Sequence, residues 1–298
     1  MKNIVLYIAM LAVGLTSCTK IIDVDLADQT STRLVVDGNV VHYLNAVDSG
    51  YQEIFLSKSR SYFDDVHSDN SVTGANVEVV NNQTGTKTIF QESTDVKGKY
   101  FTNDLIAKVG NGYTLNITAT LDGEIQDFTG TDSIITEALQ IDHIFLEEEL
   151  SFGGDTVYET NIEFINTPEQ DYFKFEVYFN DTLIKNNHGG SNFFFSLIDD
   201  SFMGPGKQEF RVVDRNIERK EETPPFKLQV KMKRISYDTF NYFRKLYANA
   251  SSGDDTPQTE VRGIVGNLTY PDRYPLGTFS ASSESQNSVV ITEYPSSN

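Results

Sequence analysis

The sequence predicts a mainly β protein with one short helix. Most of the 298-residue chain alternates apolar and polar residues with a period of two, the pattern of strands that bury one face. Helical periodicity is confined to one stretch between residues 236 and 250. An apolar fraction of 39%, with 12% aromatic residues, is enough to form packed cores.

The first half of the chain contains predicted strands separated by turn residues. The polar residues 81–85 and the pair Asp122-Gly123 interrupt the alternating runs and favour hairpins. The strands are predicted at residues 33–41, 51–57, 75–79, 86–91, 98–101, 113–119 and 124–128.

The second half begins near Thr131 and is predicted to be a larger, antiparallel β-rich domain. Aromatic and apolar residues alternate over residues 173–179 and 226–232, which indicates strands with one wet face. Ser236 is expected to cap a helix that runs to about Ala250. Further short strands are predicted at residues 140–147, 156–165, 260–266, 277–281 and 289–291.

The N-terminus is organised as a bacterial lipoprotein signal peptide over residues 1–17. Lys2 precedes an apolar run that is far shorter than the ~20 residues of a membrane-spanning helix. Residues 15–18, Leu-Thr-Ser-Cys, resemble a lipobox, in which the cysteine receives a diacylglycerol and cleavage occurs just before it. Since Cys18 is the only cysteine, it has no disulfide partner within the chain, and lipid attachment is its predicted role. The alternatives are an ordinary signal peptide with a chance cysteine, or a buried core cysteine.

Residues 18–23 are then predicted to be a lipidated tether, and membrane association is expected to occur through the lipid anchor. Thr19 follows the cysteine, where an Asp retains some lipoproteins at the inner membrane of Gram-negative bacteria, so the outer membrane is the expected location. Acyl chains contribute ~0.8 kcal/mol per buried methylene, which makes such anchoring stable.

Charge argues against nucleic acid as a partner. The chain has 24 basic and 43 acidic residues, a net charge of −19, whereas phosphate binding needs clustered Lys and Arg. Residues 207–245 are the exception, with 11 basic and 6 acidic side chains. Their lysines 227, 231 and 233 form either a basic stripe for an acidic partner or lipid headgroups, or an ordinary solvated strand face.

No catalytic, cofactor-binding or metal-binding residue is predicted. The chain contains neither a Gly-x-Ser-x-Gly elbow nor a phosphate-binding loop nor a His-Glu-x-x-His pair. Histidines 42, 67, 143 and 188 lack the spacing of a zinc site. The acids 64, 65 and 69 could hold calcium, but solvated loop acids are the favoured interpretation. The run Phe193–Phe195 is expected to be buried, with an exposed anchor as the alternative.

Four segments of the first half occur in a recognisable order: residues 72–79, Thr84-Gly85, residues 97–100 and residues 112–117. In this order they resemble an immunoglobulin-like, carboxypeptidase-regulatory-like β-sandwich. This resemblance implies a scaffold domain over residues 24–130, followed by the β-rich C-terminal domain over residues 131–298.

A set of motifs runs through both halves of the chain: residues 34–38, 54–59, 72–75, 97–100, 112–115, 228–237, 261–267 and 276–280. By the order of these motifs, the chain from Cys18 to about Ile291 resembles a lipoprotein family known as domain of unknown function 4249. Thr259-Glu260-Val261 departs from the family pattern before the last glycine strand. The resemblance implies an outer-membrane lipoprotein, often encoded beside a TonB-dependent receptor, and carries over no catalytic residue.

The predicted function is therefore a non-catalytic outer-membrane lipoprotein that serves a TonB-dependent transport system as an accessory or ligand-presenting partner. One alternative is a surface hydrolase of glycans or peptides, which would need two facing carboxylates in a cleft. The other is a structural or adhesive envelope protein. Fold class alone does not choose among them.

Overall fold

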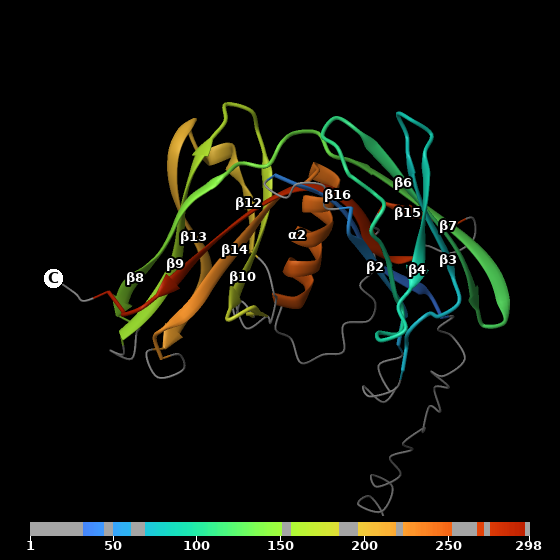
Figure 1. Ribbon diagram of the computed structural model, residues 1–298, viewed down its shortest axis with the longest axis horizontal. Coiled ribbons are helices and arrows are strands. Elements are labelled where there is room, and N and C mark those ends of the chain that lie inside the picture. The colour runs from blue at the N-terminus through green and yellow to red at the C-terminus, as the bar shows by residue number, and fades with distance from the viewer. Residues whose placement is uncertain are drawn as a thin grey trace, which may run out of the picture. The chain divides into compact units, whose positions relative to one another are not determined.

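The computed structural model describes residues 32–44, 50–60, 69–150, 156–184, 196–218, 223–251, 267–270 and 275–295. Within these residues the protein is mainly β with one α-helix, which confirms the predicted fold class (Figure 1). Cys18, the signal peptide, the tether and the predicted strand 260–266 lie outside the described residues. None of the helices in the described ranges is long and apolar enough to cross a membrane.

The strands of the first half follow the predicted order closely. They are β1 (Leu34–Tyr43), β2 (Gln52–Lys58), β3 (Asn76–Asn81), β4 (Lys87–Glu92), β5 (Lys99–Thr102), β6 (Gly112–Leu121) and β7 (Glu124–Ser133).

The second half adds further strands and the helix. They are β8 (Ile141–Leu150), β9 (Thr156–Asn166), β10 (Tyr172–Phe179), β11 (Thr182–Leu183), β12 (Ser196–Asp199), the 3-10 turn η2 (Asp200–Phe202), β13 (Gly206–Glu218), β14 (Phe226–Arg234), α2 (Tyr237–Ser251), β15 (Leu268–Thr269) and β16 (Leu276–Ile291). The sequence pattern did not reveal β11, β12, β13 or β15.

Most strands form one 13-stranded sheet, and three form a smaller one. The large sheet has the order β11-β10-β14-β16-β1-β2-β5-β4-β3-β6-β7-β15, with β12 also paired to β10. Neighbours in it are antiparallel except for β1 and β16, which are parallel. The smaller sheet has the antiparallel order β13-β9-β8.

Alternating side chains create two hydrophobic cores. In the first, apolar residues of β1, β2, β5 and β16 cluster with those of β3, β6, β7 and β15. In the second, one face of β10 and β14 packs against apolar residues of the three-stranded sheet. Phe279 and Ala281 of β16 belong to the first core, and Val289 and Ile291 of the same strand pack on the second.

The C-terminal strands were predicted wrongly as two short pieces. Leu276–Ile291 is one strand that pairs with β1 on one side and with β14 on the other. Its central residues, Ser282 to Ser288, are polar and show no strand-like alternation. Neighbouring strands satisfy their backbone groups, and Ser285 Oγ donates to the Leu139 carbonyl at 2.5 Å. Pairing with distant strands, rather than a local sequence pattern, therefore makes these residues part of a strand.

The helix begins and ends as predicted. Ser236 Oγ accepts a hydrogen bond from the Thr239 N–H at 3.2 Å, which caps the first turn. Phe240 is buried, with its ring centroid 4.9 Å from that of Tyr172 on β10. The helix thereby packs against β10, and it also contacts β12 and β16.

Candidate functional site

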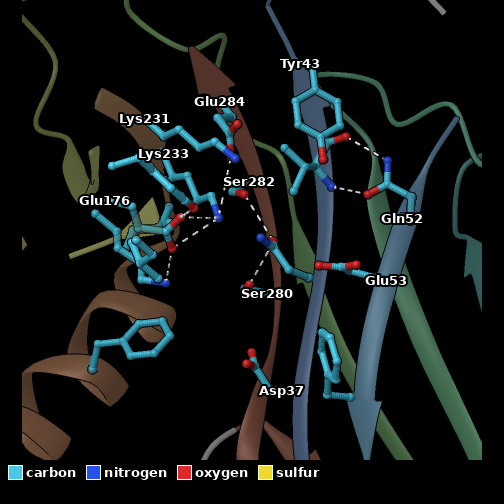
Figure 2. Close-up of a pocket in the computed structure, with 18 residues that line it drawn as sticks. Asp37, Tyr43, Gln52, Glu53, Glu176, Lys231, Lys233, Ser280, Ser282 and Glu284 are labelled. Carbon is cyan, nitrogen blue, oxygen red and sulfur yellow. Dashed lines mark hydrogen bonds and ion pairs between the residues drawn. The ribbon is translucent and has the colours of Figure 1, made fainter. Parts of the chain in front are cut away.

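A pocket lies on the face of the large sheet that points away from both cores. Five strands that are neighbours in the sheet line it, in the order β10, β14, β16, β1 and β2 (Figure 2). Its volume is about 320 Å³. Because side chains alternate along a strand, the same strands that send apolar residues into the cores send polar ones into this pocket. The lining residues are Asp37, Asn39, Val41, Tyr43, Gln52, Glu53, Phe55, Lys174, Glu176, Tyr178, Leu183, Lys231, Lys233, Ile235, Phe243, Ser280, Ser282 and Glu284.

One end of the pocket contains a cluster of paired charges on β10, β14 and β16. Lys233 Nζ lies 3.4 Å from Glu176 Oε1 and 3.5 Å from Glu284 Oε2. Lys174 Nζ donates to Glu176 Oε1 at 2.9 Å, and the Tyr178 hydroxyl donates to Glu176 Oε2 at 3.1 Å. The side chain of Lys233 is 13% exposed and that of Glu284 only 4%. The cluster is therefore a largely buried ion-pair network in the wall of the pocket.

The pKa shifts follow from burial and from these pairs. Burial alone would raise the pKa of Glu176, but the ammonium groups of Lys233 and Lys174 hold it well below its usual value. Burial alone would lower the pKa of Lys233, but Glu176 and Glu284 raise it well above the usual range. Burial and the Glu284 carboxylate together raise the pKa of Tyr43 to about 12. At neutral pH Glu176 and Lys233 therefore stay ionised. The phenols of Tyr43 and Tyr178 stay protonated, since burial and Glu176 likewise raise the pKa of Tyr178.

The floor of the pocket presents the amide of Asn39. Ser280 Oγ and Ser282 Oγ donate to Asn39 Oδ1 at 3.0 and 3.2 Å. These two bonds fix the orientation of the amide and leave its NH₂ group to donate to a ligand.

The other end of the pocket is acidic and aromatic. Asp37 lies directly opposite Phe55 in the β1–β2 register, and the Phe55 side chain is 37% exposed. Burial and the nearby Asp37 carboxylate raise the pKa of Tyr242 on α2 to about 12. Glu53, the next acid along the wall, is paired with Lys99 Nζ at 2.7 Å.

These groups suit binding better than acid–base catalysis. A general acid needs a carboxyl group whose pKa is raised toward neutrality. The pKa of Glu176 is shifted the opposite way, and so is that of Glu53, because hydrogen bonds from Lys99 and Tyr51 outweigh the effect of burial. Paired charges, a fixed amide and aromatic side chains instead form a preorganised surface for a polar ligand.

Two of the three β14 lysines that the sequence offered for a basic stripe are paired with acids. Lys227 Nζ pairs with Asp181 at 2.7 Å, and Lys233 pairs with two glutamates. The lysines do lie on the face opposite Phe226 to Met232, as predicted. The two glutamates reach Lys233 from β10 and β16 because the fold places those strands on either side of β14.

Other residues singled out by sequence are dispersed. Of the described histidines, His42 contacts the Ala107 carbonyl and Glu137 Oε1, while His143 is exposed on β8. Asp69 pairs with Lys97 at 2.7 Å. In the described ranges there is no group of three or more His, Cys, Asp or Glu arranged to hold a metal ion. Residues 64, 65, 67, 188 and 193–195 lie outside those ranges.

Sequence reasoning missed the pocket itself. Asp37 and Asn39 were assigned only to a strand, and Ser280 to Glu284 to no site. Alternation on β1 could have placed Asp37, Asn39 and Tyr43 on one face, because they are separated by even numbers of residues. Nothing in the sequence indicates that β16 lies between β1 and β14, so the convergence with Glu176 could not be predicted.

The geometry defines a mainly β protein with a polar, charge-paired pocket on one face of its large sheet. Residues 19–288 match the family described as Domain of unknown function (DUF4249), and the chain belongs to that family. This confirms the family resemblance found in the sequence. A search of curated proteins finds no match.

Proposed function

We propose that this protein is a non-catalytic outer-membrane lipoprotein that binds a polar ligand and presents it to a TonB-dependent transporter. The observation that carries the binding role is the pocket, where a five-strand surface holds charged and amide groups in fixed positions. Preorganised polar groups bind without the cost of ordering them, which favours a binding site over a structural or adhesive surface.

The proposals of a lipid anchor and of a transporter partner are supported by the sequence. The lipobox at Cys18, together with the lipoprotein character that the family resemblance implies, supports attachment to the outer membrane. The carboxypeptidase-regulatory-like segments support a scaffold role for the N-terminal half. A lipid anchor confines the protein to the plane of the transporter and so raises its effective concentration there.

Mass spectrometry of the N-terminal peptide tests the anchor. We expect the wild-type protein to begin at a diacylated and N-acylated Cys18, and the Cys18→Ser variant to lack the lipid. A chain recovered from the medium with an unmodified thiol contradicts the proposal.

Crosslinking in intact cells, followed by purification from detergent-solubilised membranes, tests the transporter role. We expect a TonB-dependent receptor, identified by mass spectrometry, to copurify with the wild type. An outer-membrane lipoprotein of another family at the same abundance serves as the control. A receptor captured equally by both, or by neither, contradicts the accessory role.

A further inference from the structure

Two charged side chains of the pocket lack an opposite charge. Lys174, Lys233, Glu176, Glu284 and Glu53 all take part in ion pairs. In the part of the chain that the structure describes, neither Lys231 nor Asp37 has an ion-pair or hydrogen-bond partner for its side-chain charge. The pocket therefore offers one uncompensated cation and one uncompensated anion.

Each of these charges has an aromatic neighbour. Lys231 Nζ lies 4.8 Å from the ring centroid of Tyr178, on the wall formed by β10 and β14. Asp37 lies directly opposite Phe55 in the β1–β2 register, and both residues line the pocket. A carboxylate beside an aromatic ring suits an ammonium group, because the ring face attracts cations as well.

The two charges lie far apart along the strands. Lys231 is opposite Gln286 on β16, and Asp37 is opposite Thr278, eight residues earlier on the same strand. At about 3.3 Å per residue this corresponds to roughly 26 Å between backbones, which sheet twist and side-chain length shorten. Figure 2 shows Lys231 and Asp37 at opposite ends of the pocket, with Ser282 and Ser280 between them.

We propose that the ligand of this pocket is an extended oligopeptide with free termini. Its ammonium lies against Asp37 and its carboxylate against Lys231. An extended chain of about five to seven residues spans roughly 15–25 Å, which is close to the offset of the two residues along β16 once side-chain length is subtracted. At about 320 Å³ the pocket encloses only part of such a chain, and the rest lies along the open face of the sheet. Between the ends, the Asn39 amide and the Lys–Glu cluster offer donors and acceptors for backbone carbonyls and N–H groups. This inference rests on the proposed function, in which the pocket binds the presented ligand.

Isothermal titration calorimetry of the lipidated full-length protein in detergent tests the proposal. The probes are mixed-sequence peptides of three, six and nine residues with free termini, and the same six-residue peptides N-acetylated or C-amidated. We expect the free six-residue peptides to bind most tightly, and each blocked terminus to weaken binding about tenfold.

Variants assign each terminus to its charge. Asp37→Asn should remove the difference between free and N-acetylated peptides, and Lys231→Met the difference between free and amidated ones. Neither side chain is buried and neither takes part in an ion pair among the described residues, so folding should be retained. Glu124→Gln and Lys108→Met, at exposed positions outside the pocket, are the matched controls.

Three results would overturn the proposal: no peptide binding by the wild type, blocked termini that change affinity less than about twofold, or pocket variants that behave like the controls. If peptides do not bind while a TonB-dependent receptor still copurifies, the peptide inference fails and the proposed function stands. If peptides bind and no receptor copurifies, the peptide site stands without the transporter role.

Discussion

Lys233 shows how single residues stabilise this site. Its ammonium group lies between two carboxylates that come from different strands, Glu176 of β10 and Glu284 of β16. Removing the ammonium group leaves both carboxylates largely buried and without the positive charge that attracts them. An uncompensated charge of that kind is more costly than the intact pair is stabilising.

Lys233→Met is therefore expected to lower the free energy of unfolding by about 3–5 kcal/mol. In the double variant Glu176→Gln/Lys233→Met the loss should be about 0.5–3 kcal/mol smaller than the sum of the single losses, because the two residues interact. Urea denaturation followed by circular dichroism measures these values. Lys87→Met removes an exposed ion pair with Glu78 and should cost no more than about 1 kcal/mol. Equal losses for Lys233→Met and Lys87→Met would refute the argument.

The same cluster predicts how stability depends on pH. The pKa of Glu176 is depressed in the folded protein, so its contribution is present above the unfolded value of about 4.3 and is lost as the pH falls below it. The pKa of Lys233 is raised, so its contribution is present below about 10.4 and is lost as the pH rises beyond that value.

Urea denaturation between pH 7 and pH 3 measures how the free energy of unfolding falls as the pH is lowered. Below the pKa of Glu176 in the unfolded chain, the free energy of unfolding of the wild type should fall by about 1.4 kcal/mol more per pH unit than that of Glu176→Gln. The reason is that the unfolding wild type binds one additional proton, at Glu176. Glu124→Gln is the control for loss of a surface acid. Parallel curves for the wild type and Glu176→Gln would show that the ion pair does not hold the carboxylate ionised.

At the scale of the element, β16 is the strand that joins the parts of the site. It pairs in parallel with β1 and antiparallel with β14, and it sends Ser280, Ser282 and Glu284 into the pocket. Near the start of β16, Gly277 lies opposite Val36 of β1 and has a φ of +88°. A Cβ at Gly277 would lie 1.9 Å from the Val36 carbonyl oxygen, so only glycine allows this close approach.

Gly277→Ala should destabilise the protein by roughly 2–4 kcal/mol, since it combines an unfavourable φ with a backbone clash. Gly123→Ala is the matched control, because Gly123 has φ of +82° and open space around it, and should cost only about 1–2 kcal/mol. Thermal unfolding of both variants makes the comparison. A Gly277 variant no less stable than the Gly123 variant would mean that the β1–β16 approach can relax.

Elements differ in how well the sequence predicts them. Strands β1 to β7, β10 and β14 alternate apolar and polar residues, so a local pattern revealed each of them. The helix was predicted because Ser236 and residues 252–257 mark its two ends. The centre of β16 and most of β13 have no such pattern, and their pairing with distant strands makes them strands.

At the scale of the whole molecule, hydrogen bonds and an ion pair connect residues that are distant in sequence. Asp132, at the end of β7, accepts hydrogen bonds from the Ala281 N–H at 2.9 Å and from Thr239 Oγ1 at 3.0 Å. Arg234 forms an ion pair with Asp171 and donates to the Glu137 carbonyl at 2.8 Å. The division into two domains between residues 130 and 131 stays a prediction. Strand β16 bears on it because its side chains pack on both hydrophobic cores.

A fragment of residues 24–130 is expected to lack a cooperative unfolding transition. It loses β16 as the neighbour of β1, and it loses Phe279 and Leu268 from the first core. Fusing residues 267–286 to a fragment of residues 24–134 through a long flexible linker should restore the transition. Amide hydrogen exchange of both fragments measures this. Strong protection in the shorter fragment would show that the first core folds without β16.

The sequence by itself determined the mainly β class, most strand positions, the helix and the family, because each depends on short-range periodicity, caps and motif order. It also determined the predictions about Cys18 and the envelope, which lie outside the described structure. Only the tertiary structure decided the pocket. Asp37, Lys231 and Glu284 come from segments up to about 250 residues apart, and strand pairing, which no local pattern encodes, brings their side chains to one face.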